Sequence, residues 1–192
     1  MKKPIDKKIL LASNSPRRRQ LLKEVVPDFE IAPSRDIDES FPPELNVLEI
    51  APYISKKKAE GYSDMIDKDT LLITADTVVI VDDHILGKPH CEAQACEMLK
   101  ELSGRMHQVV TGVTLKTKEK CVTFSDITEV FFDDLDENEI KEYIAEYKPF
   151  DKAGSYGIQE WIGCRGIKSI KGCFYNVMGL PTNRLYNHLI KF

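Results

Sequence analysis

Long apolar runs are absent from this sequence of 192 residues. No stretch approaches the roughly 18 apolar residues that a membrane-spanning helix needs. The opening Met1-Lys2-Lys3 leads into Pro4 and further charged residues, whereas a secretory signal would continue with an apolar segment. We therefore expect a cytoplasmic protein without a membrane partner.

Cysteines with the spacing of a structural site are also missing. The five cysteines are odd in number and include no CxxC motif, which argues against a disulfide framework and a zinc ribbon. The four histidines lack the spacing of zinc ligands. We interpret the thiols as reduced and structural: Cys91, Cys96, Cys121, Cys164 and Cys173.

Neither a P-loop nor a GxGxxG motif occurs, so the common strand-turn-helix nucleotide motifs are excluded. An excess of basic residues is lacking as well, because 27 lysines and arginines stand against 31 aspartates and glutamates, for a net charge of -4. This balance argues against a nucleic-acid partner, since such binding usually shows as a basic surface. Any phosphate site must be local and built in another way.

The sequence does contain an alternation of strand and helix patterns, typical of an α/β protein. Strands are predicted over residues 9–12, 29–32, 70–81, 108–116 and 121–132, and helices over residues 16–26, 92–102 and 136–147, from residue 46 and after Pro181. The turn at residues 118–120 favours antiparallel pairing of the last two strands, hence a mixed sheet. No repeat or linker divides the chain, so we expect one domain over residues 1–192.

Three consecutive arginines follow the first predicted strand, in "LASNSPRRRQLL". Ser15 fits a helix N-cap and Pro16 the first helical position, so Arg17 and Arg18 fall in the first turn. The helix dipole repels cations there. A bound phosphate would reverse this repulsion, because N–H and guanidinium groups would converge on it. The alternative is a solvated basic turn.

A single carboxylate interrupts the apolar strand "TADTVVIV". An ionised Asp76 in a buried strand is unstable unless it is paired, bound to a metal or open to a cleft. We favour a catalytic or metal-binding role, with an ion pair or a strand-end cap as the alternative. Thr77 points to the opposite face, where either β-propensity or contact with a ligand explains it.

Two lysines are candidates for phosphate binding. Asn46 and Glu49 have the spacing of a capping box, and Lys58 falls on the apolar stripe of the helix that follows. Its side chain either snorkels into solvent or reaches phosphate at the edge of the core. Lys88, in "GKP", lies on a restrained loop after a predicted hairpin.

Further polar residues lie in loops. The acidic loop over residues 34–45 is either solvated or contributes a carboxylate that helps Asp76 hold a hard cation. Its candidates are Asp38, Glu39 and Glu44. A lone histidine such as His107 is more often a structural hydrogen-bonding group than a base. Gln159, in the glycine-rich segment over residues 154–179, can donate and accept at a base edge.

The chain resembles the Maf family of nucleoside triphosphate pyrophosphatases in the order and spacing of six segments: "LASNSPRR", "ADTVV", "GKP", "SGRMHQVVTG", "DKAGSYGIQ" and "YNVMGLP". These segments span nearly the entire chain. The resemblance implies an α/β fold with a mixed twisted sheet, flanking helices and two lobes around a cleft, related to the inosine triphosphate pyrophosphatase type. It also implies a homodimer that depends on Mg²⁺ or Mn²⁺.

Members of this family hydrolyse a nucleoside triphosphate to the monophosphate and pyrophosphate, and the resemblance implies roles for matching residues. Asp76 resembles the catalytic proton acceptor, and with Glu39 it would hold the metal. Arg17, Thr77 and Gln159 match positions of base selection, in the pattern of the branch that acts on dTTP and UTP. The phosphates would be bound by Ser15, Arg18, Lys58 and Lys88.

Two other classes of function stay open at this point. A nucleotide-binding regulator of cell division or septum formation would not need an intact Asp76, and its binding would survive metal chelation. A nucleic-acid binder built on residues 17–19 would show a steep salt dependence, which the acidic chain opposes. Within the enzyme class, a modified pyrimidine nucleotide is the rival substrate.

Overall fold

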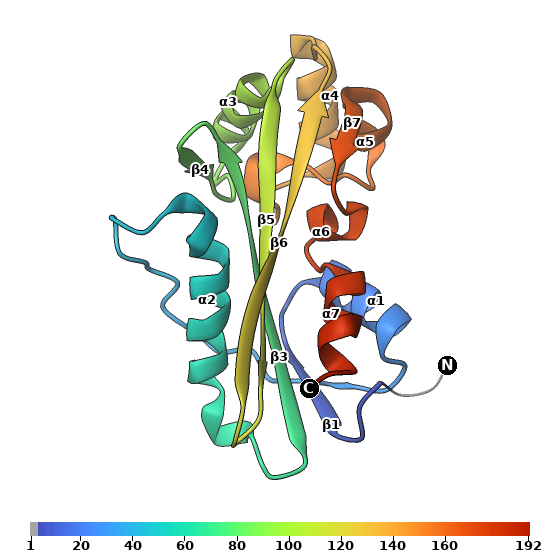
Figure 1. Cartoon of the computed structure of the whole chain (residues 1–192). Helices are drawn as coiled ribbons and strands as arrows, with labels where there is room; N and C mark the ends of the chain where they lie inside the picture. The colour runs from blue at the N-terminus through green and yellow to red at the C-terminus, as the bar shows by residue number, and fades with distance from the viewer. Residues whose placement is uncertain (1–3) are drawn as a thin grey trace. The chain divides into compact units, whose positions relative to one another are not determined.

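The computed structural model describes residues 4–192, and these residues form a seven-stranded sheet with helices beside it (Figure 1). The strands are β1 (Lys8–Ala12), β2 (Glu30–Ile31), β3 (Thr70–Val81), β4 (His84–Leu86), β5 (Met106–Lys116), β6 (Cys121–Phe132) and β7 (Ile167–Lys171). The helices are α1 (Pro16–Val25), α2 (Val47–Gly61), α3 (Glu92–Leu102), α4 (Glu137–Tyr147), α5 (Trp161–Gly166), α6 (Phe174–Met178) and α7 (Thr182–Leu189). Two short 3-10 turns are η1 (Ser63–Met65) and η2 (Ala153–Ser155).

Parallel and antiparallel pairs both occur in the sheet, whose strand order is β2-β1-β3-β5-β6-β7 with β4 beside β3. Strand β1 pairs in parallel with β2 and β3, whereas β4 is antiparallel to β3 and β7 is antiparallel to β6. A tight turn joins β5 to β6, and in it the N–H of Thr117 donates to the carbonyl of Lys120 at 2.8 Å. The predicted mixed sheet with flanking helices is confirmed.

Most elements lie where the sequence patterns placed them. The strands over residues 70–81 and 121–132 have the predicted bounds. Asn46 caps α2, but its side chain accepts the N–H of Leu48 at 2.9 Å, which is not the contact of a capping box. The glycine-rich segment over residues 154–179 also contains α5, β7 and α6, which are too short to produce a periodic pattern.

The chain divides into two compact units. The first unit comprises the chain up to Asp76, Thr111–Asp126 and Gly179–Phe192, and the second comprises Thr77–Val110 and Ile127–Met178. Strands β3, β5 and β6 contribute residues to both. The single domain expected over residues 1–192 stays a prediction.

Strand β3 is buried along its length, and Thr77 is its one residue that is only half-buried. Continuous burial is typical of a strand covered on both faces. In the first unit, Figure 1 shows α2 on one side of the strands and α1 with α7 on the other. A carboxylate in β3 therefore has little access to water and requires a partner.

Helix α2 packs on β5 without a side chain between the two backbones. A Cβ added to Gly112 would lie 2.3 Å from the nitrogen of Pro52 and 2.4 Å from the carbonyl carbon of Ala51, so only glycine fits. A buried hydrogen bond ties the same helix to β3, because the hydroxyl of Thr74 donates to the carbonyl of Ser55 at 2.6 Å. These contacts set the distance between α2 and strands β3 and β5.

In the second unit, α3 and α4 pack against each other. Their apolar faces supply Leu99, Leu102 and Ile140 to a buried cluster that also includes Val109 and Val130 of the sheet. Leu99 and Leu102 are three positions apart, a spacing that places both side chains on one face of α3.

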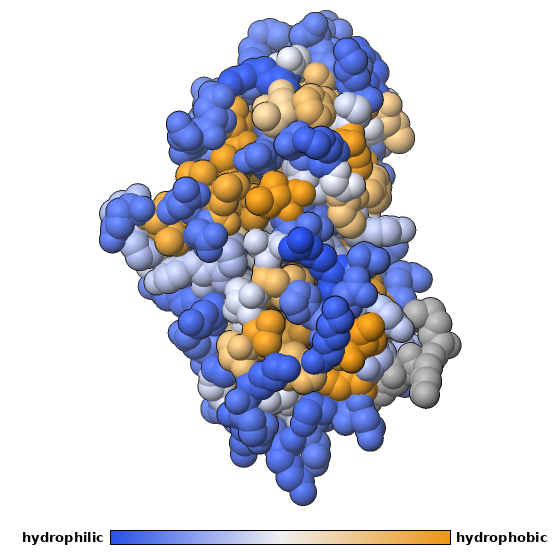
Figure 2. Space-filling model, viewed as in Figure 1, coloured by the Kyte–Doolittle hydropathy of each residue, from blue (hydrophilic) through white to orange (hydrophobic). Residues whose placement is uncertain are grey.

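Hydrophilic side chains cover most of the face shown in Figure 2, with apolar side chains in small groups between them. The large apolar side chains that are exposed belong to both units, with Trp161, Phe174 and Tyr175 in the second. Over residues 4–192, no helix combines the length and the apolar character needed to cross a bilayer.

We expect Gly112→Ala to lower the free energy of unfolding by about 1–3 kcal/mol, since the added methyl group would overlap backbone atoms of α2. Urea denaturation followed by circular dichroism measures this loss. Gly87→Ala is the matched control, because a Cβ at that position meets no atom within 4 Å. Equal stability of the two variants would contradict the close contact.

Candidate functional site

The first group of candidate residues lies at the N-terminus of α1. Ser15 is the N-cap, and its Oγ accepts the backbone N–H of Arg18 at 3.4 Å. Pro16 occupies the first turn, Arg17 and Arg18 follow it, and the turn contains no acidic residue. The folded chain therefore retains the unfavourable placement of cations at the positive end of a helix dipole.

The guanidinium group of Arg18 is directed onto the main chain. Its Nε donates to the carbonyl of Gly179 at 2.8 Å, and its Nη1 donates to the carbonyl of Ala75 at 2.9 Å. Arg19 donates in the same way to the carbonyl of Ser13, at 3.4 Å. Carbonyl oxygens thus offset part of the positive charge, and Arg18 is fixed beside β3.

The charged groups around Arg18 influence one another. Burial lowers the pKa of the Arg18 guanidinium. The carboxylate of Asp76 opposes this shift, the charge of Arg17 adds to it, and the carboxylate of Glu39 opposes it. An arginine stays charged at neutral pH even so. Two adjacent guanidinium groups at a helix N-terminus favour an anionic ligand.

Lys58 joins two carboxylates that the sequence singled out. Its Nζ lies 2.7 Å from Oδ1 of Asp76 and 2.9 Å from Oε1 of Glu39. The side chains of Lys58 and Asp76 are only 16% and 12% exposed, whereas that of Glu39 is 52% exposed. This ion pair explains how a carboxylate is tolerated in β3 and why Lys58 does not snorkel into solvent. It is compatible with a catalytic role for Asp76.

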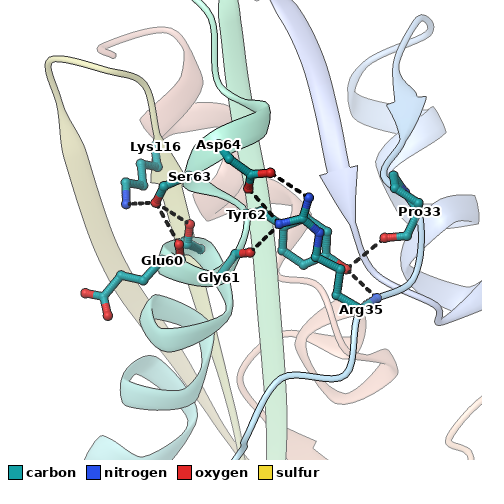
Figure 3. Close-up of polar contacts among 9 residues, drawn as sticks. Pro33, Arg35, Glu60, Gly61, Tyr62, Ser63, Asp64 and Lys116 are labelled. Carbon is teal, nitrogen blue, oxygen red and sulfur yellow. Dashed lines mark hydrogen bonds and ion pairs between the residues drawn. The ribbon is translucent and has the colours of Figure 1, made fainter.

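The loop that carries Glu39 is anchored to the end of α2. Figure 3 shows Arg35 donating to both carboxylate oxygens of Asp64, at 2.6 and 2.8 Å. The guanidinium carbon of Arg35 lies 5.0 Å from the centroid of the Tyr62 ring. The Tyr62 hydroxyl donates to the carbonyl of Pro33 at 3.0 Å (Figure 3). A bidentate pair and an aromatic contact therefore hold the start of the loop.

Further contacts follow this loop along α2. Ile37 lies against Gly61, where an added Cβ would be 2.7 Å from Cδ1 of the isoleucine. Oδ2 of Asp38 accepts from Nζ of Lys57 at 2.7 Å, and this hydrogen bond holds the pKa of the Asp38 carboxyl well below its usual range. These contacts place the next residue, Glu39, beside the ammonium group of Lys58.

Glu44, a further candidate of the acidic loop, is exposed in the first unit, and the other remaining candidates belong to the second unit. Lys88 and Gln159 are exposed and Thr77 is half-buried. The loop that carries Lys88 is tied to the glycine-rich segment, because the N–H of Gly154 donates to the carbonyl of Gly87 at 3.1 Å. Within residues 4–192, the side chain of Lys88 makes no hydrogen bond or ion pair, and the side chain of Gln159 makes none either.

His107 is buried, and its Nε2 lies 2.7 Å from the hydroxyl of Tyr156. The imidazole also makes an edge contact with Phe132, with 5.1 Å between the ring centroids. Burial lowers the pKa of His107 to about 3, so its ring is uncharged at neutral pH. These contacts support the structural interpretation of this histidine.

Several residues that hold the candidates in place carry no recognisable signal in the sequence. Arg35 and Asp64 lie 29 positions apart, and nothing in either segment indicates that they pair. Lys152 belongs to the segment "DKAG" of the family resemblance, but its burial and its ion pair with Glu160, at 3.0 Å, are tertiary features.

The oxygen donors of the first unit fit a divalent cation. Asp76 and Glu39 each place one carboxylate oxygen within 2.9 Å of the Lys58 ammonium group, so the two carboxylates lie near each other and are the candidates for holding a cation. No group of three or more His, Cys, Asp or Glu side chains in the described part of the chain could hold a metal by itself. Mg²⁺ is usually bound by one or two carboxylates together with substrate phosphates and water. The donor set therefore suits a cation that arrives with a phosphate ligand.

The chain is similar over nearly its whole length to proteins of known name. A family model described as Maf-like protein matches residues 8–192. A dTTP/UTP pyrophosphatase of Parabacteroides distasonis is 52% identical over 185 residues, which cover 96% of each chain. A protein of the same name from Bacteroides thetaiotaomicron is 50% identical over 183 residues, which cover 95% of each chain.

Similarity to solved structures is lower in sequence. A HAM1 protein from Coxiella burnetii matches with a TM-score of 0.51 over 97% of this chain and 100% of its own, at 14% identity. At this level of identity the similarity concerns the fold alone, and it agrees with the predicted α/β fold.

We expect the free energy of unfolding to fall as the pH drops below about 6.5. Burial depresses the pKa of His107 to about 3 in the folded chain, so the unfolded chain binds this proton first, and stability is lost between pH 6.5 and 3. The loss from this group at pH 5 is about 2 kcal/mol. Urea denaturation at several pH values measures it. His107→Gln should flatten this part of the profile, and an unchanged slope would assign it to other groups.

Proposed function

Because the chain belongs to the Maf family, we propose that it is a nucleoside triphosphate pyrophosphatase that converts dTTP and UTP to the monophosphate and pyrophosphate. Relatives about half identical to it carry this activity in their names. The observation that carries the proposal is the cluster of Asp76, Lys58 and Glu39. It provides a candidate base, an ammonium group and a second carboxylate at one place, with Arg18 nearby.

Asp76 is the group to which we assign proton transfer. Its Oδ1 accepts from Lys58 at 2.7 Å, and Oδ2 is the oxygen assigned to take a proton from water. Attack of this water on the α-phosphorus breaks the bond between that phosphorus and the oxygen that bridges to the β-phosphorus. Pyrophosphate leaves with the bridging oxygen, the monophosphate gains the oxygen of water, and solvent later receives the proton from Asp76.

Positive groups bind the phosphates in this proposal. Arg17 and Arg18 lie at the N-terminus of α1, where the backbone N–H groups and the hydroxyl of Ser15 also favour an anion. Lys58 and Lys88 add ammonium groups. Lys88 is exposed and makes no hydrogen bond or ion pair with the residues that the structure describes, so its side chain is available to a ligand.

Asp76 and Glu39 would hold Mg²⁺ or Mn²⁺, which when bound neutralises negative charge on the phosphates. Lys58 keeps the two carboxylates together by contacting both. Base selection is assigned to Arg17, Thr77 and Gln159, of which Gln159 offers both a donor and an acceptor. A modified pyrimidine nucleotide, the alternative substrate, would be bound by the same residues.

The family resemblance extends the proposal to a homodimer in the cytoplasm. Static light scattering during gel filtration should give twice the mass of the chain, and a monomer at micromolar concentration would contradict the dimer. A fluorescent fusion that locates to the membrane or to nucleic acid would contradict the cytoplasmic assignment.

We expect Asp76→Asn to lower kcat for dTTP and UTP by about 100-fold or more, because an amide cannot accept the proton. Pyrophosphate release from dTTP, UTP, CTP, GTP and 7-methyl-GTP in the presence of Mn²⁺ measures the effect. Asp82→Asn is the control: it removes a carboxylate at the end of β3, at a residue with φ of 50°, a conformation that asparagine tolerates.

The outcomes of this assay separate the candidate functions. Retained turnover in Asp76→Asn would remove the residue from catalysis. No turnover of any nucleotide by the wild type, with binding that survives chelation, would favour a nucleotide-binding regulator. Full activity in the presence of a chelator would contradict the metal requirement.

A further inference from the structure

The guanidinium group of Arg18 joins two segments of the first unit that are far apart in the sequence. Its Nε donates to the carbonyl of Gly179 at 2.8 Å, and its Nη1 donates to the carbonyl of Ala75 at 2.9 Å. A guanidinium group is planar and rigid, so one group that contacts both carbonyls restrains their positions relative to each other. We refer to these two hydrogen bonds as the Arg18 bridge.

On one side, the bridge supports β3 just beyond its pairing with β1. The parallel register of the two strands ends with Ala12 beside Thr74, and β1 itself ends at Ala12. Ala75, the next residue of β3, is buried, and a buried carbonyl requires a donor. Arg18 supplies that donor from the helix that follows β1. The guanidinium group therefore holds β3 where the neighbouring strand stops.

The peptide bond between Ala75 and Asp76 transmits this contact to the candidate base. Because a peptide group is planar, the carbonyl of Ala75 lies in one plane with the nitrogen and the Cα of Asp76. Arg18 thus restrains the main chain of Asp76, while Lys58 restrains its side chain through Oδ1, at 2.7 Å. The two contacts together set the direction of the carboxylate.

On the other side, the carbonyl of Gly179 holds the guanidinium group. Gly179 lies between α6 and α7, in the segment "YNVMGLP", to which the proposed function assigns no role. Its φ of 112° lies in a region that side chains disfavour, so glycine suits this position. Gly179 is buried, and α7, which follows it, packs against α1, the helix of Arg18. The acceptor of the Nε–H is therefore held in place relative to α1.

Arg19 provides an internal comparison. Its Nε and Nη2 both donate to the carbonyl of Ser13, each at 3.4 Å. These long hydrogen bonds join α1 only to the turn that precedes it. The bridge to β3 is thus a property of Arg18 and does not follow from the run of three arginines as such.

We propose that Arg18 is a positioning residue for the candidate base: held by Gly179, it fixes the peptide bond before Asp76 and thereby sets the direction of the carboxylate. The inference rests on the proposed function, because it takes Asp76 as the base. It adds a second role to the phosphate contact proposed for Arg18. The two roles are separable, since uniform binding of phosphate acts on affinity and positioning of a base acts on turnover.

Arg18→Lys tests the positioning role. Lysine keeps the positive charge at the N-terminus of α1, but its single ammonium group lacks the rigid fork that contacts both carbonyls. Turnover is measured as pyrophosphate release from UTP with Mn²⁺, and affinity by calorimetric titration of the non-hydrolysable α,β-imido analogue of UTP with the same metal. We expect kcat to fall by about tenfold or more and Kd to change by less than about threefold. An unchanged kcat with weaker binding would overturn the inference.

Arg19→Lys is the matched control, because it makes the same replacement at the next residue of α1 without touching the bridge. Its kcat and Kd should equal those of the wild type. An equal fall of kcat in both variants would assign the effect to a general disturbance of the helix and would also overturn the inference.

Gly179→Ala tests the other end of the bridge. A side chain at a φ of 112° strains the main chain and displaces the carbonyl, so kcat should fall as it does in Arg18→Lys. In an Arg18→Lys background, Gly179→Ala should lower kcat by less than about twofold, because the contact is already lost. Multiplicative effects of the two substitutions would contradict the bridge. Gly104→Ala also places alanine at a positive φ, of 66°, but outside the bridge, and it should keep the wild-type kcat.

Proton exchange of the guanidinium groups in the nucleotide-free protein tests the bridge without turnover. With isotopically labelled arginine, the Nε–H of Arg18 should exchange with water at least about tenfold more slowly than that of Arg19, and this difference should disappear in Gly179→Ala. Rapid exchange in a wild type that hydrolyses dTTP and UTP would overturn the inference and leave the proposed function intact. A protected proton in a protein that hydrolyses no nucleotide would support the bridge and overturn the proposed function.

Discussion

The ammonium group of Lys58, shared between Asp76 and Glu39, is the interaction on which the site of the first unit depends. A carboxylate within β3 and a lysine on the apolar stripe of α2 would each be unfavourable alone, because burial removes the water that stabilises their charges. Together they compensate one another. Removal of one partner would leave an uncompensated charge at the edge of the core, so the strand, the helix and the loop of Glu39 must be in place together.

Each unit contains one exposed candidate residue whose neighbours are held by hydrogen bonds and ion pairs. Glu39 is more than half exposed, yet its loop is anchored through Arg35 and Asp64 and then follows α2. Gln159 is exposed as well, and in the same turn the N–H of Gly157 donates to the hydroxyl of Tyr143. A side chain that meets a ligand must reach solvent, so its position has to be set by neighbours rather than by its own packing.

The sequence predicted single elements well and contacts between elements poorly. Periodicity located β3, and the anomaly of a carboxylate in an apolar strand drew attention to Asp76, as the lysine on an apolar stripe did to Lys58. A pattern of this kind reports on one segment at a time. It could therefore not reveal that Lys58 joins two carboxylates, or that Arg35 pairs with Asp64. Asn46 shows the same limit on a small scale: its role as a cap was predictable, but its hydrogen-bond partner was not. The roles in nucleotide hydrolysis came from the family resemblance.

The contact of Gly112 with α2 has a consequence for the flexibility of the site. Backbone meets backbone at this point, so no rotatable side chain lies between the helix and the sheet to absorb a displacement. Thermal motion of α2 is thereby coupled to that of the strands beneath it, and the lysine on the helix and the aspartate on β3 fluctuate as parts of one body. Such a pair has little conformational entropy left to lose, so under the proposed function the absence of one methyl group would contribute to the affinity for a triphosphate at a distance from it.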